Sequence, residues 1–381
     1  MALRRIDNPP NPYTHAHADW LEPPPEARLE VFEERTGAAL SHNDSPDIPF
    51  RWSLNPYRGC QHACAYCYAR PTHEYLGFGA GTDFDSKICV KINAPEALRE
   101  RLSRPSWRRE LIAFSGVTDC YQPLEAVYQL TRRCLEVCVE RRNPVGIVTK
   151  SFLIVRDAEL LAELNRVAEA TVYCSIPFAD DALARQIESG APAPSRRFEA
   201  MRRLHAAGVP VAVMVAPLIP GLNDREIPAV LKRAAECGAR SASFIPLRLP
   251  GAVREVFFSR LAAVAPQRVR RVEAQVRAMR GGRLSESRFG ARMRGAGVYW
   301  EGVRRLFAMT AQRLGMTTAG RPVSEGTEAP QESEGMKAPQ ESEGMKAPQG
   351  SERTEAPQES EGAARKSPLA AQASVVQLPL F

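Results

Sequence analysis

The sequence predicts an α/β protein whose main domain is a partial (β/α)6, TIM-like barrel. Two observations indicate this fold. Short apolar runs alternate with amphipathic segments from about residue 51 to residue 246, and strands that alternate with helices pair in parallel through right-handed crossovers. Six such units within roughly 200 residues suit an open or partial barrel. A doubly wound sheet is the alternative.

Six apolar runs are the expected strands. They cover residues 51–54, 111–115, 145–149, 171–176, 209–216 and 241–245. The segments between them have helical periodicity. In residues 157–170, for example, Leu160, Leu161 and Leu164 share one helical face. The segment 223–238 begins with an Asn–Asp cap, which favours a helix start.

We expect four regions along the chain. The first 50 residues, rich in Pro, His and acids, form an extended arm over the main domain, with one short helix in PEARLEVFEERTG. The barrel spans 51–254, and a basic helical extension spans 255–318. Residues 319–381 repeat APQESEGMK at a nine-residue step and have no apolar face to bury, so we expect a disordered tail.

Composition indicates a cytoplasmic protein with no membrane partner. No run of 18 apolar residues is present, and the first residues lack the apolar core of a secretory signal. Nine cysteines spread through the chain do not suggest a disulfide framework. Residues 319–381 contain six Lys or Arg and ten Asp or Glu, so the net charge of +7 leaves +11 on residues 1–318. That charge suggests a polyanionic partner, with solubility as the alternative.

Three cysteines follow the first expected strand, in the segment GCQHACAYCYAR. Cys60, Cys64 and Cys67 have CxxxCxxC spacing, and the next cysteine, Cys89, is 22 residues further on. A structural zinc site takes four protein ligands, and an iron–sulfur cube takes four thiolates. His62 lies inside the loop, where its ring is poorly placed to complete a tetrahedron. Three thiolates leave one position open for a small molecule, with structural zinc or buried core cysteines as alternatives.

Polar side chains follow the next three expected strands. Thr118 and Asp119 follow the second, Lys150 ends the third and Ser175 ends the fourth. Because the carboxyl ends of parallel strands meet at one edge of a sheet, we expect these residues to lie beside the cysteine loop.

The CxxxCxxC motif, with the aromatic Tyr66 before its last cysteine, resembles the signature of the radical SAM superfamily. NPYRGCQHACAYCYARP, TDCYQPLE, VTKS, ESGAPAPSRR and APLIPGLND are similar to segments of its spore photoproduct lyase-like, or "DNA repair photolyase", branch. Within that branch, the chain is most similar to an uncharacterised bacterial family. The resemblance covers about residues 45–310.

This resemblance implies a cofactor pair and its chemistry. Cys60, Cys64 and Cys67 would hold a [4Fe–4S] cluster whose free iron chelates S-adenosylmethionine. An electron, from a donor such as flavodoxin or ferredoxin, would cleave the C–S bond and give a 5′-deoxyadenosyl radical that abstracts hydrogen from the substrate. The protein would supply placement and exclude water.

The resemblance also assigns cofactor contacts by position. They are Tyr66 (adenine, through its backbone), Ser115, Gly116 and Asp119 (amino group), Lys150 (carboxylate) and Ser175 (ribose or carboxylate). For Lys150 the alternative is a surface lysine without a cofactor role, and for Ser175 it is a plain buried serine. Glu188 and Arg197 are further candidates that could equally face solvent on a helix, whereas Asn223 and Asp224 more naturally cap one.

The hydrogen donor of spore photoproduct lyase is a cysteine shortly before the Asp of the second loop. Here Gly116 and Val117 occupy that place, which puts thymine-dimer reversal in doubt. Cys120 and Tyr121 are the candidate donors, and a small buried hydrophobe is the alternative for Cys120. The other cysteines are expected in the core: Cys89, Cys134, Cys138, Cys174 and Cys237.

Two features suggest macromolecular partners. Residues 260–313 are rich in arginine, which favours phosphate binding, and Phe289, Tyr299 and Trp300 offer stacking surfaces. The alternative is a solvated arginine-rich face. The terminal QLPLF resembles the peptide with which bacterial repair proteins bind the DNA polymerase sliding clamp, through Gln377, Leu378, Leu380 and Phe381. A frayed hydrophobic end is the alternative.

The sequence therefore predicts a radical SAM enzyme that acts on DNA, in the manner of a repair lyase. Two alternatives are open: a radical SAM enzyme for RNA, a peptide or a metabolite, and a metal-stabilised nucleic-acid-binding adaptor without turnover.

Overall fold

The computed structural model describes residues 8–13, 28–318 and 375–376. Its main sheet has eight strands, and the six expected strands are all among them. In spatial order they are β11 (Thr317–Thr318), β10 (Ser241–Pro246), β9 (Val211–Leu218), β8 (Ala170–Ser175), β7 (Val145–Thr149), β6 (Ile112–Phe114), β3 (Trp52–Leu54) and β2 (Leu40–His42). All neighbours are parallel except β2 and β3.

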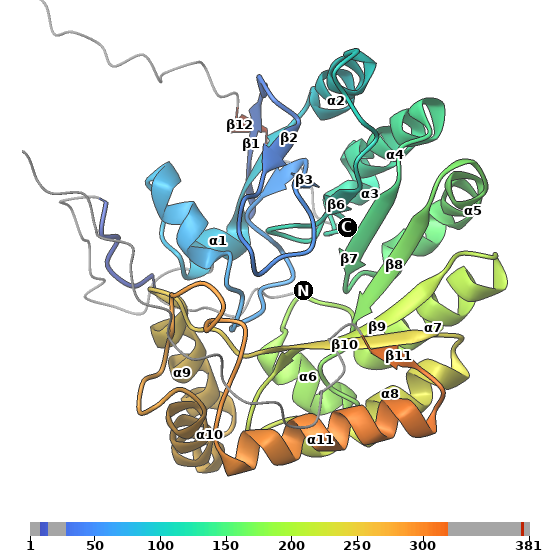
Figure 1. The fold of residues 1–381 in the computed structure, drawn as a ribbon. Helices are drawn as coiled ribbons and strands as arrows, with labels where there is room; N and C mark the ends of the chain where they lie inside the picture. The colour runs from blue at the N-terminus through green and yellow to red at the C-terminus, as the bar shows by residue number, and fades with distance from the viewer. Residues whose placement is uncertain (1–7, 14–27, 319–374, 377–381) are drawn as a thin grey trace, which may run out of the picture. The chain divides into compact units, whose positions relative to one another are not determined.

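Strand order distinguishes the two predicted architectures. From β3 to β10 the strands cross the sheet in chain order, and the edge strands β2 and β11 do not pair with each other. A doubly wound sheet reverses its order at a switch point. The fold is therefore the predicted partial barrel (Figure 1). We call the edge at which β3 and β6 to β10 end the mouth of the barrel.

Helices connect the strands and cover the outside of the sheet (Figure 1). They are η1 (Arg70–Leu76), α1 (Thr82–Ser86), α2 (Ala94–Ser103), α3 (Glu125–Tyr128), α4 (Leu130–Arg141), η2 (Phe152–Asp157), α5 (Ala158–Val167), α6 (Asp181–Ile187), α7 (Pro194–Ala206), η3 (Asp224–Glu226) and α8 (Ile227–Glu236). No helix in the described part of the chain is long and apolar enough to cross a membrane.

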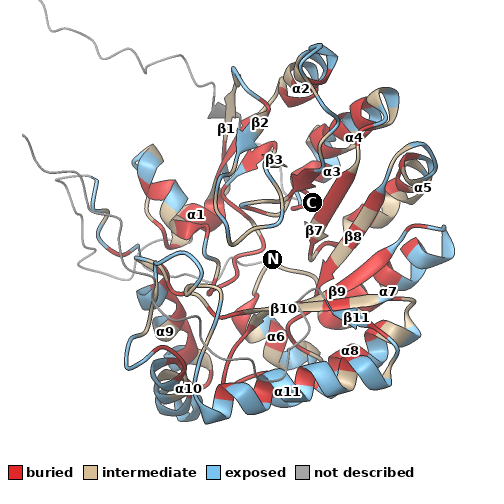
Figure 2. Cartoon of the chain, in the orientation of Figure 1, coloured by how far each residue is buried: buried red, intermediate tan, exposed pale blue. Residues whose placement is uncertain are grey.

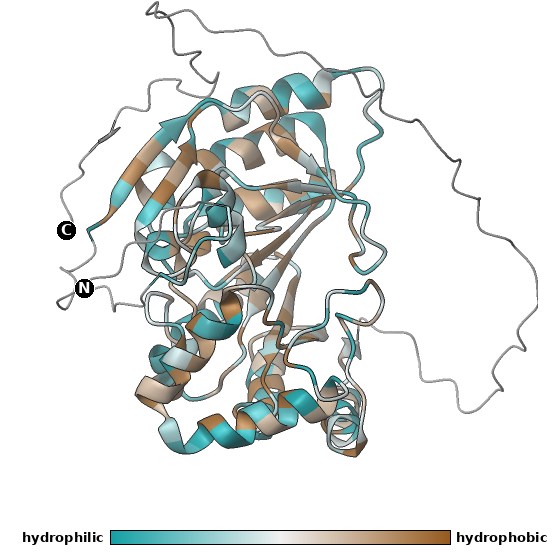
Figure 3. Cartoon of the chain, turned by 90° about the vertical axis from the view of Figure 1, so that its left-hand side faces the viewer, coloured by the Kyte–Doolittle hydropathy of each residue, from teal (hydrophilic) through white to brown (hydrophobic). Residues whose placement is uncertain are grey.

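The core lies between the helices and the sheet. Ile147 and Val172 on the strands, and Leu161 and Leu231 on the helices, are fully buried in one hydrophobic cluster. Figure 2 shows the central strands largely buried, and Figure 3 shows hydrophobic residues along them, with hydrophilic residues on the outward faces of the helices. Apolar burial of this kind is the main stabilising contribution to the fold.

The prediction of a helix in the N-terminal region is wrong. Its residues instead form β1 (Glu30–Glu34), which pairs in parallel with β5 (Lys87–Lys91) in a second sheet that also contains β4 (Tyr57–Arg58) and β12 (Val375–Val376). Val31 is buried against Ile88 and Val90. Burial and strand pairing outweigh the helical propensity of the flanking glutamates.

The region after the barrel is helical, as expected, with one exception. Its helices are α9 (Val253–Val264), α10 (Pro266–Met279) and α11 (Val298–Arg313), and residues 280–297 between the last two are not helical. The expectation that Trp300 offers a stacking surface is wrong, because its side chain is buried beside Phe244. It shares an apolar face of α11 with Val303 and Phe307. The predicted tail and terminal peptide lie outside the described residues, apart from β12.

Candidate active site at the mouth of the barrel

The three cysteines lie in a buried loop that follows β4. Cys60 and Cys64 are buried and Cys67 is half-buried, and backbone hydrogen bonds from Ala63 to Cys60 and from Cys67 to Cys64 fold the loop on itself. Gly59 allows the turn into the loop. Its φ is +79°, and a Cβ there would lie 2.9 Å from the carbonyl oxygen of Lys87.

A second segment holds the loop from the opposite side. The amide of Ala65 donates to the carbonyl of Ile187, and Cys64 and Glu188 form a short antiparallel bridge. A Cβ on Gly190 would lie only 2.0 Å from the carbonyl oxygen of Gln61. The close approach of the two segments therefore requires glycine at residue 190.

The donor set suits a bound cluster. Burial raises the pKa of all three thiols, that of Cys64 to about 12, so a bound cation must favour the thiolate form that ligates metals. In the described part of the chain, no three His, Cys, Asp or Glu side chains converge closely enough to hold a single metal ion. Three thiols without a fourth protein ligand among the described residues fit an iron–sulfur cluster with one open position better than a structural zinc site, which takes four protein ligands.

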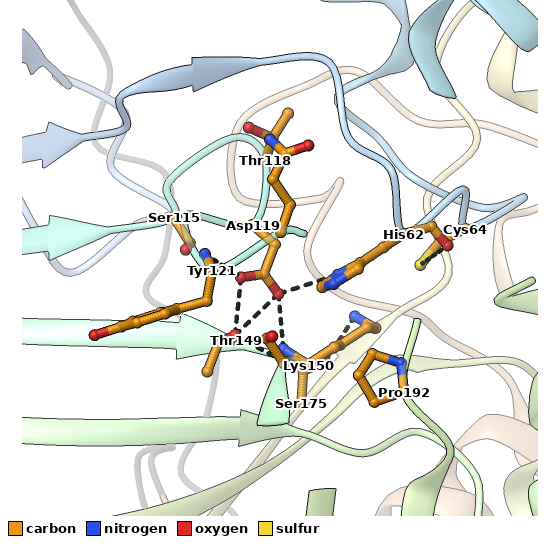
Figure 4. A network of polar contacts seen from close by, with 12 residues as sticks. His62, Cys64, Ser115, Thr118, Asp119, Tyr121, Thr149, Lys150, Ser175 and Pro192 are labelled. Carbon is orange, nitrogen blue, oxygen red and sulfur yellow. Dashed lines mark hydrogen bonds and ion pairs between the residues drawn. The ribbon is translucent and has the colours of Figure 1, made fainter. Parts of the chain in front are cut away.

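Asp119 connects the cysteine loop to the end of β7 (Figure 4). Its carboxylate accepts hydrogen bonds from the Thr149 hydroxyl (2.8 Å) and from the amides of Lys150 (2.7 Å) and Tyr121 (2.9 Å). Nδ1 of His62, inside the cysteine loop, lies 3.3 Å from the same carboxylate. Burial acts to raise the pKa of Asp119, but His62 and these hydrogen bonds outweigh it and lower the pKa to about 2.

A buried charge network stands beside this carboxylate. The Lys150 ammonium donates to the Ser175 hydroxyl (2.9 Å) and lies 4.0 Å from Glu188. Arg197 donates to the other Glu188 oxygen at 2.5 Å, and the Tyr66 hydroxyl also bonds this carboxylate. Burial acts to raise the pKa of Glu188, but the charges of Arg197 and Lys150 lower it. Glu188 and Arg197 therefore face the site rather than solvent, the alternative that the sequence left open.

Ser115 and Gly116 form the turn after β6. Ser115 has a φ of +67°, and its hydroxyl accepts a hydrogen bond from the amide of Cys120 (2.8 Å). A Cβ on Gly116 would lie 2.8 Å from the Cβ of Ser53, so a larger residue does not fit. The carbonyl of Gly116 accepts a hydrogen bond from the Tyr68 hydroxyl (2.7 Å).

Cys120 and Tyr121 are both fully buried. The Tyr121 hydroxyl donates to Asp157 of η2 (3.1 Å), and its ring points away from Lys150 and His62 (Figure 4). A hydrogen donor must reach the substrate, so this placement favours structural roles for both residues. Their catalytic role stays a prediction. The other free cysteines lie in or against the core, as expected.

Four further residues bear on the cysteine loop, and the sequence reasoning assigned no role to them. Arg70 is fully buried, and its guanidinium donates to the carbonyl of Cys64 (2.9 Å) and pairs with Asp85 (2.9 Å). His62 contacts Asp119, and Tyr68 contacts Gly116, as described above. For His62, Tyr68 and Arg70 the available signal was their proximity to the cysteines in sequence, but spacing does not reveal which neighbouring side chains point inward.

The partial barrel and the three thiols beside its mouth suit an enzyme that holds an iron–sulfur cluster and a small-molecule cofactor. A family model described as the radical SAM superfamily matches residues 54–234. The chain is 42% identical to an uncharacterized protein of Mycobacterium tuberculosis over 226 residues. This aligned region covers 59% of this chain and 66% of the length of that protein. It is also 31% identical to an uncharacterized protein of Methanocaldococcus jannaschii over 200 residues. This aligned region covers 52% of this chain and 72% of the length of that protein.

The chain belongs to the radical SAM superfamily, and its cofactors are a [4Fe–4S] cluster and S-adenosylmethionine. Its fold is shared with spore photoproduct lyase complexed with dinucleoside spore photoproduct, with a TM-score of 0.52 and 15% identity, over 76% of this chain and 81% of that one. The predicted likeness to spore photoproduct lyase is thus confirmed at the level of the fold.

Proposed function

We propose that this radical SAM enzyme acts on nucleic acid, most directly on DNA, in a lyase-type repair or modification reaction. The observation that carries the proposal is the surplus of arginine along α10 and residues 280–297, next to the mouth that contains the cysteine loop. Arg268, Arg270 and Arg271 are all exposed on α10, where each can neutralise a phosphate. The shared fold with spore photoproduct lyase, whose solved complex contains a dinucleoside photoproduct, supports this assignment.

The bound cluster and S-adenosylmethionine supply a radical that removes hydrogen from the substrate. Cys60, Cys64 and Cys67 would ligate the cluster. The Lys150 ammonium is positioned to bind a carboxylate of the cofactor, because its only carboxylate contact within the described residues is at the 4.0 Å limit. The oxygens of Asp119 already accept hydrogen bonds from the protein, so this residue would position the loop rather than bind the cofactor's amino group.

Further partners complete the proposal. Nucleic acid would bind through residues 255–318, and the DNA polymerase sliding clamp would bind Gln377, Leu378, Leu380 and Phe381, which lie outside the described residues. A flavodoxin or ferredoxin would supply the electron, and the reaction would take place in the cytoplasm. The adaptor alternative is set aside because radical SAM membership identifies an enzyme.

The test is anaerobic turnover of the reconstituted protein on irradiated and undamaged DNA. The proposal predicts that DNA stimulates release of 5′-deoxyadenosine and that bases of one of the two substrates are altered. Stimulation by RNA, a peptide or a metabolite instead, with no chemistry on DNA, would favour the alternative radical SAM enzyme.

A further inference from the structure

Arg248 lies at the mouth of the barrel, two residues after the end of β10. Its neighbours Leu247 and Leu249 are buried in the same apolar cluster as Cys64 and Tyr66. The backbone of this segment is therefore fixed against the cysteine loop.

The Arg248 guanidinium faces the residue that follows the last cysteine of the motif. Its Cζ atom lies 5.7 Å from the ring centroid of Tyr68, a residue that is 46% exposed. The guanidinium also lies 3.7 Å from the sulfur of Met293 in the non-helical segment after α10. A cation and an open aromatic face thus stand together at the rim of the site.

Two more arginines surround this position. Arg280 donates to the carbonyl of Leu247 at 2.8 Å and contacts the carbonyl of Arg292 at 3.4 Å. The Arg292 guanidinium pairs with Asp47 at 2.6 Å. Of the three guanidinium groups, only that of Arg292 pairs directly with a carboxylate of the described residues, and the charge of Glu286 acts on Arg280 without an ion pair.

The positive charges of Arg248 and Arg280 have no direct ion-pair partner among the described residues. Among the described residues, neither Arg248 nor Arg280 has a carboxylate within ion-pair distance, and the buried Nε atoms of both lack a hydrogen-bond partner. Burial, and then the charge of Arg292, lowers the pKa of Arg248, while burial and then Arg248 lower that of Arg280. An anion bound beside Arg248 would relieve the repulsion between the guanidinium groups.

We infer that Arg248, supported by Arg280 and Arg292, binds a phosphodiester group of the substrate at the rim of the active site. A planar guanidinium without an ion pair matches a phosphate oxygen, and the half-exposed Tyr68 can stack against the adjoining base. This inference rests on the proposed function, because it states how a nucleic acid would be held beside the cysteine loop.

The test compares two small probes on the reconstituted holoenzyme with S-adenosylmethionine bound. One probe is the thymidine dinucleotide with its phosphodiester, and the other is the same dinucleotide with a neutral methylphosphonate linkage. Calorimetry measures the dissociation constant of each for the unaltered protein and for R248Q, R248K and R313Q. Arg313 is an exposed arginine at the end of α11, so R313Q removes the same charge at a distance from the mouth.

We expect the unaltered protein and R313Q to bind the charged probe about tenfold or more tightly than the neutral one. R248Q should lose this preference, and R248K should keep only part of it, because lysine retains the charge but not the planar fork. Iron content and thermal unfolding show whether each variant is folded. An undiminished preference in both Arg248 variants, or no preference in the unaltered protein, would overturn the inference.

The binding comparison needs no turnover, so it can fail independently of the proposed function. If the unaltered protein releases no 5′-deoxyadenosine while the preference depends on Arg248, the proposed function fails and the phosphodiester site stands. If DNA stimulates cofactor cleavage while the preference for the charged probe does not depend on Arg248, the proposed function stands and the phosphodiester site fails.

Discussion

At the scale of single residues, Lys150 is the group best placed to meet the cofactor. It follows the last residue of β7, donates to Ser175 at the end of β8 and stands 5.7 Å from the ring centroid of Tyr66. Its ammonium is therefore held by two strands and the cysteine loop. Such preorganisation reduces the entropic cost of binding a carboxylate.

We predict that K150M weakens binding of S-adenosylmethionine by about tenfold or more, because a charge-assisted hydrogen bond is lost. Anaerobic equilibrium dialysis with the reconstituted protein measures the affinity. The matched control is K232M, which removes an exposed lysine of α8. Equal affinity in K150M and K232M would show that Lys150 does not contact the cofactor.

Asp119 gives a prediction about pH. Its pKa of about 2 in the folded protein lies below the value of about 3.9 of an unfolded chain. The ionised form thus favours folding. Its contribution, on the order of 2 kcal/mol, is present above pH 4 and is lost as the pH falls through 2. Urea unfolding of the cluster-free protein should lose stability more steeply on acidification than that of D119N. Parallel curves for the two proteins would contradict this assignment.

At the scale of elements, the cysteine loop is held between the turn after β6 and the segment that contains Glu188 and Gly190. We predict that G190A displaces the loop, because the new Cβ would overlap the carbonyl of Gln61. Iron per chain after reconstitution should fall together with the melting temperature.

Gly302 provides the control for that change. It lies within α11, and a Cβ there would meet nothing within 4 Å. G302A should keep full iron content and gain about 0.5–1 kcal/mol of stability, the usual preference for alanine in a helix. Normal iron content in G190A would mean that the loop tolerates the intrusion.

Elements with a clear periodicity could be predicted from the sequence, and those decided by tertiary contacts could not. The runs at 145–149 and 171–176 became β7 and β8 because each is apolar and short. The segment at 30–34 became a strand only because β5 lies beside it, which local propensity does not reveal. Likewise, the sequence is equally consistent with an exposed and with a buried Trp300. Only the fold places Phe244 beside this side chain.

In the site, too, the features set by local sequence could be predicted and those set by tertiary contacts could not. Residues placed by strand ends, such as Asp119, Lys150 and Ser175, could be predicted because parallel strands end together. Arg70 and Asp85 could not, since their pairing depends on how η1 and α1 pack. Arg248 and Arg280 were also beyond prediction as a pair, because they come from segments 32 residues apart and meet only through the fold.

At the scale of the whole molecule, the chain carries the barrel and, far along the sequence, the segment QLPLF. A tethered binding peptide would raise the effective concentration of the enzyme at its target. We predict that the full chain retains the sliding clamp in a pull-down and that L378A/F381A loses it. The matched control is Q372A/S374A, which alters two polar residues of the tail upstream of the peptide. Equal retention of the clamp by both variants would remove this partner from the account.

Anaerobic reconstitution shows whether three thiolates hold a cluster whose open position binds S-adenosylmethionine. We expect about four irons per chain, the brown absorbance of a [4Fe–4S] cluster, and release of 5′-deoxyadenosine on reduction. Loss of all three signals on changing Cys60, Cys64 or Cys67 to Ala would support it. A colourless protein that contains one zinc ion per chain and leaves S-adenosylmethionine intact would contradict it.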